Sequence, residues 1–335
     1  MCFPVVEAFR GGPSLIRVVG HRGARGILPE NSMIGFEFAM STGAHLLEFD
    51  VVLTGDDVPV ITHNHRLHAP TFREPGGLFL QGKEPKVASL TWAEMQAFEI
   101  GRIDGTSDYG QRFLDQAQLD GVHVPRLLDL LRLVAQPQYG AAQLMLELKS
   151  DPDFAHDADY RKRIVETVVG EVRSTGLSAR TLLHSFDWKL LAECQAQAPD
   201  IPTSFLTQLP GNADEVGEDT SKSISPDFSG RERQIPDMVR EAGGKLWCPY
   251  VHDVTPVDIE RAKKLGLCIA VWTVNELADI DRMIDLEIDA IVSDYPGRVQ
   301  RRLSDRGFSW ISEAASAGHQ SPAEQAATTP AAAKV

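Results

Sequence analysis

One apolar segment of this chain carries two acids whose spacing suits chemistry. Within Leu46–Leu53, a single residue separates Glu48 from Asp50. Side chains alternate between the two faces of a strand, so both carboxylates point to one face, while Phe49 and Val51 point to the other. Strands of a parallel sheet are normally apolar on both faces, and buried carboxylates are costly unless something compensates them. The spacing therefore predicts a site where these acids meet positive charge.

A second segment repeats this arrangement, because Glu147 and Lys149 share one face of a strand. If both segments belong to one barrel, Glu48, Asp50 and Glu147 converge at its carboxyl-terminal end. Three hard oxygen ligands suit Mg²⁺ or Ca²⁺ rather than zinc. The alternative is a buried salt-bridge network. In that network Glu48 pairs with Arg22, and Glu147 pairs with Lys149.

The pair His21-Arg22 directly follows the first apolar run and is flanked by Gly20 and Gly23. In a barrel this position lies at the rim where active sites gather. The two glycines let the backbone approach a ligand closely. The planar guanidinium of Arg22 has the geometry that suits phosphate oxygens.

A second histidine, His63, ends residues 58–63, a predicted short hairpin arm that returns to the same rim. Two histidines at one rim can serve as a general acid and a general base. His65 and His68 are nearby, and exposed loop positions are favoured for both. Surface positions are also expected for His45, His123, His156, His252 and His319.

Eight short apolar runs rich in β-branched residues recur along the chain. They are Ile16–Val19, Leu46–Leu53, Gln143–Leu148, Thr181–His184, Thr203–Leu206, Lys245–Cys248, Cys268–Thr273 and Ala290–Ser293. Helical periodicity separates most of them, at Ser32–Thr42 (with Asn31 or Ser32 as N-cap), Asp159–Ser174, Trp188–Ala198, Glu232–Ala242, Pro256–Leu265 and Glu276–Ile284. This alternation predicts an α/β fold with a parallel sheet, and eight repeats favour a closed TIM (β/α)8 barrel. A doubly wound open sheet is the alternative, weakened because no Gly-rich dinucleotide fingerprint follows the first run.

One segment departs from this alternation. Residues 64–131 lie between the second and third predicted barrel strands and are too long for an ordinary βα loop. They predict an excursion over the barrel mouth, with a helix near Thr91–Phe98. We therefore expect a single barrel domain over residues 14–310, with an insertion at about 66–130. The acidic, Ser-rich loop Gly211–Gly230 is expected to be flexible, and the tail at 314–335 is expected to be disordered.

Composition narrows the class of protein. No run of about 18 apolar residues exists, and the N-terminus lacks the pattern of a secretory signal, so a cytoplasmic protein without stable membrane insertion is expected. The four cysteines form no CxxC pair and are expected to be mostly buried thiols. A net charge of −14 without a basic face argues against nucleic-acid binding. That charge repels a phosphate substrate, so the site must supply its own local cations.

Taken together, these motifs resemble the glycerophosphodiester phosphodiesterase family. The resemblance rests on the order and spacing of His21-Arg22-Gly23, Pro29-Glu30-Asn31-Ser32, Gly43-Ala44, Glu48-Phe49-Asp50-Val51, Thr54 and Val60-Ile61-Thr62-His63. Later segments also fit: Glu147-Leu148-Lys149, Ser185-Phe186-Asp187, Val271-Trp272-Thr273-Val274-Asn275 and Ser293-Asp294-Tyr295-Pro296.

The resemblance implies a TIM barrel that hydrolyses glycerophosphodiesters to glycerol 3-phosphate and an alcohol. It further implies a role for each matching residue. Glu48, Asp50 and Glu147 would hold the divalent metal, and His21 and His63 would be the acid and base pair. Arg22 and Lys149 would contact phosphate, Trp272 would line the glycerol side, and Glu30 would support the rim. The family pattern also suggests the glycerol 2-hydroxyl as nucleophile, giving a cyclic phosphate that water opens.

This chain departs from the family pattern at Asn64, where Asp usually follows the second histidine. A neutral amide cannot stabilise a neighbouring imidazolium as a carboxylate does. Two other functions stay open beside glycerophosphodiester hydrolysis: cleavage of lysophospholipids, if the insertion (with Leu78-Phe79-Leu80) presents an apolar rim, and phosphodiester binding without catalysis. The preferred alcohol, the choice between Mg²⁺ and Ca²⁺, and the oligomeric state are not determined by the sequence.

Overall fold

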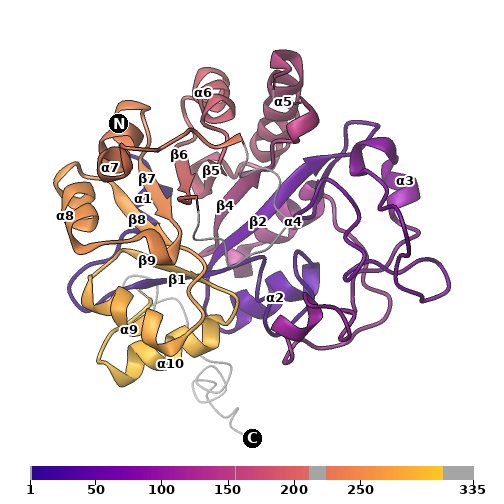
Figure 1. The fold of residues 1–335 in the computed structure, drawn as a ribbon, viewed down its shortest axis with the longest axis horizontal. Helices are drawn as coiled ribbons and strands as arrows, with labels where there is room; N and C mark the ends of the chain where they lie inside the picture. The colour runs from indigo at the N-terminus through magenta and orange to yellow at the C-terminus, as the bar shows by residue number, and fades with distance from the viewer. Residues whose placement is uncertain (1, 155, 211–223, 312–335) are drawn as a thin grey trace, which may run out of the picture.

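The strands of this chain close into a barrel (Figure 1). The computed structural model describes residues 2–154, 156–210 and 224–311. Its barrel strands are β1 (Arg17–Gly20), β2 (Leu46–Leu53), β4 (Gln143–Leu148), β5 (Thr181–Ser185), β6 (Thr203–Thr207), β7 (Leu246–Pro249), β8 (Cys268–Val271) and β9 (Ala290–Ser293). Each pairs in parallel with its neighbours, and β1 closes the ring by pairing with both β2 and β9. The expected TIM barrel and its eight strand segments are confirmed.

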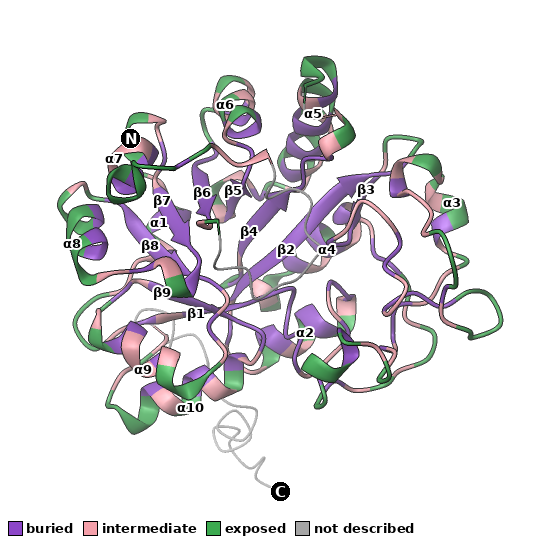
Figure 2. Ribbon diagram, in the orientation of Figure 1, coloured by how far each residue is buried: buried purple, intermediate pink, exposed green. Residues whose placement is uncertain are grey.

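Helices cover the outside of the ring. They are α2 (Met33–Ser41), α4 (Leu127–Val134), α5 (Ala158–Ser174), α6 (Trp188–Gln197), α7 (Ile235–Glu241), α8 (Pro256–Lys264), α9 (Leu277–Asp285) and α10 (Pro296–Asp305). Short 3₁₀ helices lie at Val87–Ser89, Gly110–Arg112, Pro137–Tyr139, Pro152–Phe154, Ser178–Arg180, Glu232–Gln234 and Val251–Asp253. Figure 2 shows the consequence: apart from the half-buried first residues of β1 and β4, the barrel strands are buried, and the helices turn their exposed faces away from the sheet.

The starts of several helices are fixed by side-chain caps. Ser32 accepts a hydrogen bond from the backbone of Gly35, so Ser32 rather than Asn31 is the N-cap of α2. Asp157, Asp187 and Thr255 cap α5, α6 and α8 in the same way. Among the described residues, no helix is both long and apolar enough to cross a membrane.

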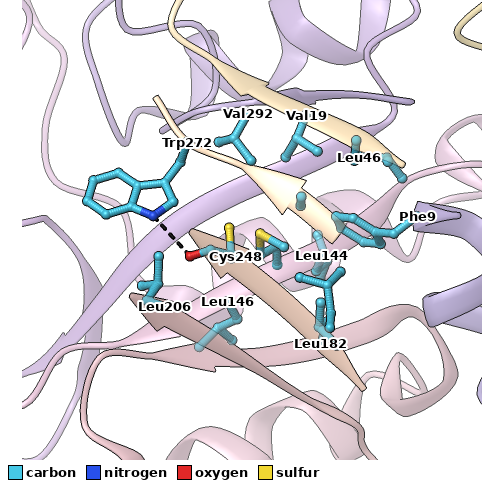
Figure 3. Packing of buried hydrophobic residues seen from close by; sticks show 14 of the residues in the cluster. Phe9, Val19, Leu46, Leu144, Leu146, Leu182, Leu206, Cys248, Trp272 and Val292 are labelled. Carbon is cyan, nitrogen blue, oxygen red and sulfur yellow. Dashed lines mark hydrogen bonds between the residues drawn. The ribbon is translucent and has the colours of Figure 1, made fainter. Parts of the chain in front are cut away.

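Apolar side chains fill the interior of the barrel from its amino-terminal end to its carboxyl-terminal end. Figure 3 shows Val19, Leu46, Leu182 and Val292 gathered between Trp272 and Phe9. Phe9 belongs to α1 (Pro4–Phe9), a short helix that the sequence patterns did not predict, and its ring is fully buried. Because α1 contacts β5 and β8, it closes the amino-terminal end of the barrel and leaves the carboxyl-terminal end for polar groups.

The excursion after β2 is anchored to the barrel by a short strand. β3 (Pro59–Ile61) pairs antiparallel with β2, as the predicted hairpin arm requires. The segment that follows contains α3 (Trp92–Met95), which begins at a capping box of Thr91 and Glu94. It builds a small core of its own with Leu67, Phe72, Leu80, Val87, Met95, Ile100 and Val124, which packs on Val52 and Val60 of the two strands. The insertion is therefore an ordered wall beside the barrel mouth (Figure 1).

Candidate active site

Three carboxylates meet at the carboxyl-terminal end of β2 and β4. Asp50 and Glu147 are register partners on these adjacent strands, and Glu48 lies one inward position earlier. One oxygen from each lies within 4.8 Å of the others, and all three side chains are buried. The structure therefore brings together the three acids that strand alternation had selected.

Two cations lie against this carboxylate cluster. The backbone N–H of Arg22 donates to Glu48 at 3.0 Å, and its guanidinium Nε lies 3.3 Å from Asp50. Lys149 Nζ lies 3.0 Å from Glu147 and 3.6 Å from Asp50. The carboxylate cluster is present, and of the alternative salt-bridge network the Glu147–Lys149 pair is present as well. The expected Glu48–Arg22 ion pair is not, because the guanidinium pairs with Glu30 and Asp50 while Glu48 contacts the backbone of Arg22. Lys149 is fully buried and is not among the residues that line the cavity.

The protonation of the carboxylates reflects this crowding. Burial raises the pKa of Glu48 well above its usual range, and the neighbouring Asp50 and Glu147 raise it further. Burial also opposes ionisation of Asp50, but His63, Arg22 and Lys149 outweigh it and hold the pKa of Asp50 well below its ordinary value. The cluster thus carries more acid than its own cations neutralise, and hard oxygen donors in this number fit a divalent cation such as Mg²⁺ or Ca²⁺.

His21 is held in place by a buried acid. Its Nδ1 lies 2.7 Å from Asp294 at the end of β9, and its Nε2 lies 3.7 Å from Glu48. Asp294 also accepts hydrogen bonds from Arg25 at 2.8 and 3.0 Å, and from Asn275 at 2.7 Å. Burial lowers the pKa of His21, and the two nearby arginines lower it further, whereas Asp294 raises it. A neutral imidazole with an oriented Nε2 results.

The turn that carries His21 and Arg22 depends on glycine. Arg22 adopts a φ of +48° and Gly23 one of +87°, both in the left-handed region. A Cβ at Gly20 would lie 2.1 Å from the carbonyl oxygen of Gly23, so the turn folds back on its own start. This compact turn directs the backbone N–H of Arg22 at Glu48.

His63 follows β3 and is oriented by the residue next to it. Its Nδ1 lies 2.8 Å from the side-chain oxygen of Asn64, which can accept a hydrogen bond from the ring. Asn64 therefore supplies the orientation that the family's usual Asp would give, without the negative charge. The amide at position 64 is therefore compatible with a fixed orientation of the His63 ring.

The Pro29-Glu30-Asn31-Ser32 segment contacts the site from the other side. Glu30 accepts a hydrogen bond from Arg22 at 3.0 Å and another from the hydroxyl of Tyr109 in the insertion. Asn31, at a left-handed φ of +53°, donates to Asp50 at 2.8 Å. The segment thus positions a guanidinium and a carboxylate, while Ser32 starts α2.

One expectation about the histidines is wrong. His68 was expected at an exposed loop position, but it is buried and packs edge-on against Tyr109, with ring centroids 4.7 Å apart. The insertion folds over it, and that contact joins residues 41 positions apart in the sequence. Local sequence around His68 carries no signal of this burial.

The cavity at the barrel mouth has a charged side and an apolar side. His21, Arg22, Glu48, His63 and Glu147 line the first, and Phe186, Leu206, Cys248, Trp272 and Val292 line the second. Trp272 donates its indole N–H to the carbonyl oxygen of Cys248 at 3.1 Å (Figure 3). Its ring meets Phe186 nearly at right angles, with centroids 5.4 Å apart.

The Ser185-Phe186-Asp187 segment fixes the turn from β5 into α6. Ser185 donates to the carbonyl oxygen of Leu148 at 2.8 Å, and Asp187 accepts from Ser150 at 2.6 Å while it caps α6. Both contacts join β5 to the residues on either side of Lys149. Phe186 is thereby held in the cavity wall.

Sequence reasoning overlooked His184, which lines the same cavity from β5 and is 2% exposed. Its Nδ1 lies 2.7 Å from the hydroxyl of Ser204 on β6. The alternation argument that selected Glu147 would also have found it, because the two are register partners at the carboxyl end of adjacent strands. Asp294 and Arg25 were not assigned a role either, since their partners are far away in the sequence.

The barrel is closed and parallel, and its carboxyl-terminal mouth holds acids, cations and two oriented imidazoles. This arrangement is typical of an enzyme that acts on an anionic substrate. The sequence profile of the glycerophosphoryl diester phosphodiesterase family matches residues 21–298. The chain belongs to this family and is a phosphodiesterase by class.

Individual relatives agree with this assignment. A crystal structure of a family protein from Silicibacter pomeroyi DSS-3 shares 49% identity and a TM-score of 0.87, and the match covers 92% of this chain and all of the other. The glycerophosphodiester phosphodiesterase of Caldanaerobacter subterraneus subsp. tengcongensis is 24% identical over 285 residues, which cover 83% of this chain and 94% of that protein. A phosphodiesterase of Oleispira antarctica, solved with sn-glycerol 3-phosphate, has the same fold, with a TM-score of 0.63 and 21% identity over 87% of this chain and 97% of the other.

Proposed function

We propose that this enzyme hydrolyses glycerophosphodiesters to glycerol 3-phosphate and an alcohol with the aid of a divalent metal ion. The observation that carries the proposal is the cluster of Glu48, Asp50 and Glu147, two of which line one cavity together with His21 and His63. The Oleispira protein with bound sn-glycerol 3-phosphate supports the choice of product.

Glu48, Asp50 and Glu147 would hold Mg²⁺ or Ca²⁺. When bound, the metal supplies positive charge that stabilises the charge developing on the phosphoryl oxygens. Arg22 lines the same cavity and presents a planar guanidinium to a phosphate oxygen. Lys149 would provide a second cation by exchanging its ion pair with Glu147 for one with the substrate.

The two histidines divide the proton transfers. His21 suits the general base, since its neutral Nε2 accepts the proton of the nucleophilic hydroxyl and Asp294 then stabilises the imidazolium. His63 suits the general acid, which protonates the departing alcohol. Water then opens the cyclic phosphate formed by the glycerol 2-hydroxyl, which gives glycerol 3-phosphate. Trp272, with Phe186, offers an apolar surface to the carbons of the glycerol moiety.

Turnover of glycerophosphocholine with detection of glycerol 3-phosphate tests the proposal. We expect activity that is lost with EDTA and restored by Mg²⁺ or Ca²⁺. The His21→Ala and His63→Ala variants should each lose most of their turnover while keeping the circular dichroism of the folded chain. Near-normal rates in either variant would refute its assignment, and phosphodiester binding without any turnover would favour a non-catalytic binding barrel.

Lysophospholipids are a second candidate substrate class, because the insertion exposes two large apolar side chains. Leu78 is 73% exposed and Leu114 is 76% exposed. An assay of lysophosphatidylcholine beside glycerophosphocholine separates the two substrates. A higher kcat/KM for the lipid that falls in a Leu78→Ser/Leu114→Ser double variant would favour the lipid.

A further inference from the structure

The wall of the catalytic cavity contains a third imidazole that the proposed reaction does not use. His184 lies on β5 between Glu147 of β4 and Ser204 of β6, its register partners on either side. The position is at the boundary between the charged and apolar sides of the cavity, since Phe186 and Leu206 follow on the apolar side.

The ring of His184 is fixed and uncharged. Nδ1 lies 2.7 Å from the hydroxyl of Ser204, which is itself fully buried. Burial is the main cause that lowers the pKa of His184, to about 3, so the ring is neutral at physiological pH. Within residues 2–154, 156–210 and 224–311, its Nε2 has no hydrogen-bond partner, and the ring forms part of the cavity wall.

A neutral nitrogen at this position fits a hydroxyl group better than a phosphate or a cation. Ser204 can either donate to Nδ1 or accept from it, so Nε2 acts as an acceptor in one tautomer and a donor in the other. A hydroxyl can pair with either form, because it both donates and accepts. The His184 ring is not part of the candidate metal site. The ligand atoms that lie within 4.8 Å of one another belong to Glu48, Asp50 and Glu147.

A polyol bound against the apolar side of the cavity needs a hydrogen-bond partner from the protein for its hydroxyl groups. A glycerol moiety that packs against Phe186 and Trp272 has to give up hydrogen bonds from its hydroxyls to water. The indole N–H of Trp272 is already donated to the carbonyl oxygen of Cys248. His184 is a neutral hydrogen-bonding side chain on the strand that also carries the cavity wall into Phe186.

We propose that His184 is a specificity-determining residue whose Nε2 hydrogen-bonds a hydroxyl of the substrate's glycerol moiety, with Ser204 holding the ring in position. This inference rests on the proposed function, which brings a glycerophosphodiester into this cavity. It adds a recognition element for the glycerol side that is separate from the metal, the phosphate cations and the two catalytic histidines.

The test compares two small anions that differ in their hydroxyls. Binding of sn-glycerol 3-phosphate and of propyl phosphate is measured by calorimetry in the presence of Mg²⁺. We expect the intact protein to prefer glycerol 3-phosphate by about tenfold or more, the value of one neutral hydrogen bond in a dry site. His184→Phe should abolish that preference, and His184→Gln, which keeps an amide near the position of Nε2, should restore part of it.

Matched variants separate recognition from packing. Ser204→Ala, which leaves Nε2 but frees the ring, should reduce the preference to an intermediate value and raise KM for glycerophosphocholine more than it lowers kcat. Thr181→Val changes a fully buried side chain at the other end of β5 and should leave the preference intact. Circular dichroism checks that each variant is folded, and His184→Gln keeps the test valid if His184→Phe does not fold.

Failure of this inference is distinguishable from failure of the proposed function. If the intact enzyme turns over glycerophosphocholine and His184→Phe and His184→Gln both keep the full preference for glycerol 3-phosphate, the role of His184 is wrong and the function stands. If His184→Phe weakens Mg²⁺ binding tenfold without substrate and leaves the preference unchanged, His184 belongs to the metal site and the inference is overturned. An intact protein without turnover overturns the function itself.

Discussion

At the scale of single residues, Asp294 joins three side chains at the site. It is fully buried and contacts His21, Arg25 and Asn275, and these contacts outweigh burial and hold its pKa well below the ordinary value. Arg25 is also almost completely buried. One carboxylate therefore orients an imidazole and neutralises a guanidinium that water cannot reach.

Replacing this carboxylate should damage catalysis and stability together. We expect Asp294→Asn to lower kcat by about 100-fold or more, because the amide neither fixes the His21 tautomer nor stabilises an imidazolium. It should also destabilise the fold by about 3 kcal/mol, because the charge of Arg25 loses its buried partner. Steady-state kinetics and urea unfolding measure the two effects. Asn275→Ala, which removes one hydrogen bond to the same carboxylate, should cost only about 1 kcal/mol, and equal losses in both variants would contradict this account.

Two variants of Asn64 separate its effect on the orientation of the His63 ring from the effect of a negative charge at this position. Its side-chain oxygen lies 2.8 Å from Nδ1 of His63. We expect Asn64→Ala to reduce kcat about tenfold, in the range typical of a misplaced general acid. Asn64→Asp keeps an acceptor at the same place and should stay within about threefold of the original kcat. If the alanine and aspartate variants had the same kcat, the hydrogen bond to His63 would have no catalytic role.

At the scale of elements, the contact between α4 and α5 partly buries a carboxyl group, which raises its pKa. Burial raises the pKa of Glu171 on α5 to about 7, and Asp129 of α4 adds to this effect. Its Oε2 lies buried without a hydrogen-bond partner among the residues that the structure describes. Because the folded state holds this proton more tightly than the unfolded chain, whose value is near 4.5, stability falls as pH rises from about 4.5 to 7.

The variant Glu171→Gln should remove this pH dependence. We expect it to match the original protein near pH 4.5 and to be about 1 kcal/mol more stable at pH 8, a value reduced to allow for partial exposure. Urea unfolding across this pH range measures the difference. Glu166→Gln, at an exposed position of the same helix, should show no such trend. A Glu171→Gln variant that is less stable than the original protein at pH 8 would show that the carboxylate is stabilising.

At the scale of the whole molecule, an acidic chain buries three cations together with carboxylates at the mouth of the barrel. The net charge is −14, yet Arg22, Arg25 and Lys149 are buried at the barrel mouth. Their carboxylate partners still leave room for a divalent cation, which would complete the local balance. With that cation bound, the charge at the site would oppose the repulsion of an anionic substrate by the net charge of the chain.

A bound divalent metal should consequently stabilise the entire fold. At about 100 times its dissociation constant, Mg²⁺ or Ca²⁺ adds about 2.7 kcal/mol if it binds only the folded chain. The effect should be larger at pH 8 than at pH 6, because the raised pKa of Glu48 means that protons compete with the metal. Thermal unfolding with and without EDTA measures the shift. Glu147→Gln should lose it and Glu166→Gln should keep it, while equal shifts in both would rule out this cluster as the metal site.

The sequence alone determined the barrel and half of its site. Eight apolar runs that alternate with helical segments predict parallel strands. Alternation along β2 and β4 puts Glu48 with Asp50 on one face, and Glu147 with Lys149 on one face. Those rules are local, since they depend on residues one or two positions apart. Their positions directly after predicted strands selected His21, Arg22 and His63. The resemblance to a family then gave each of them a role and added Trp272.

Only the tertiary structure decided which partners these residues have. Asp294 contacts His21 across 273 positions of sequence, and Tyr109 of the insertion covers His68 and contacts Glu30. Closure of the ring between β1 and β9 creates the first contact, and folding of the insertion against the mouth creates the others. His184 is an intermediate case, because alternation assigns its direction but only the closed barrel shows that it faces a cavity rather than a packed core. Contacts of this kind depend on how distant segments pack, and no local periodicity encodes them.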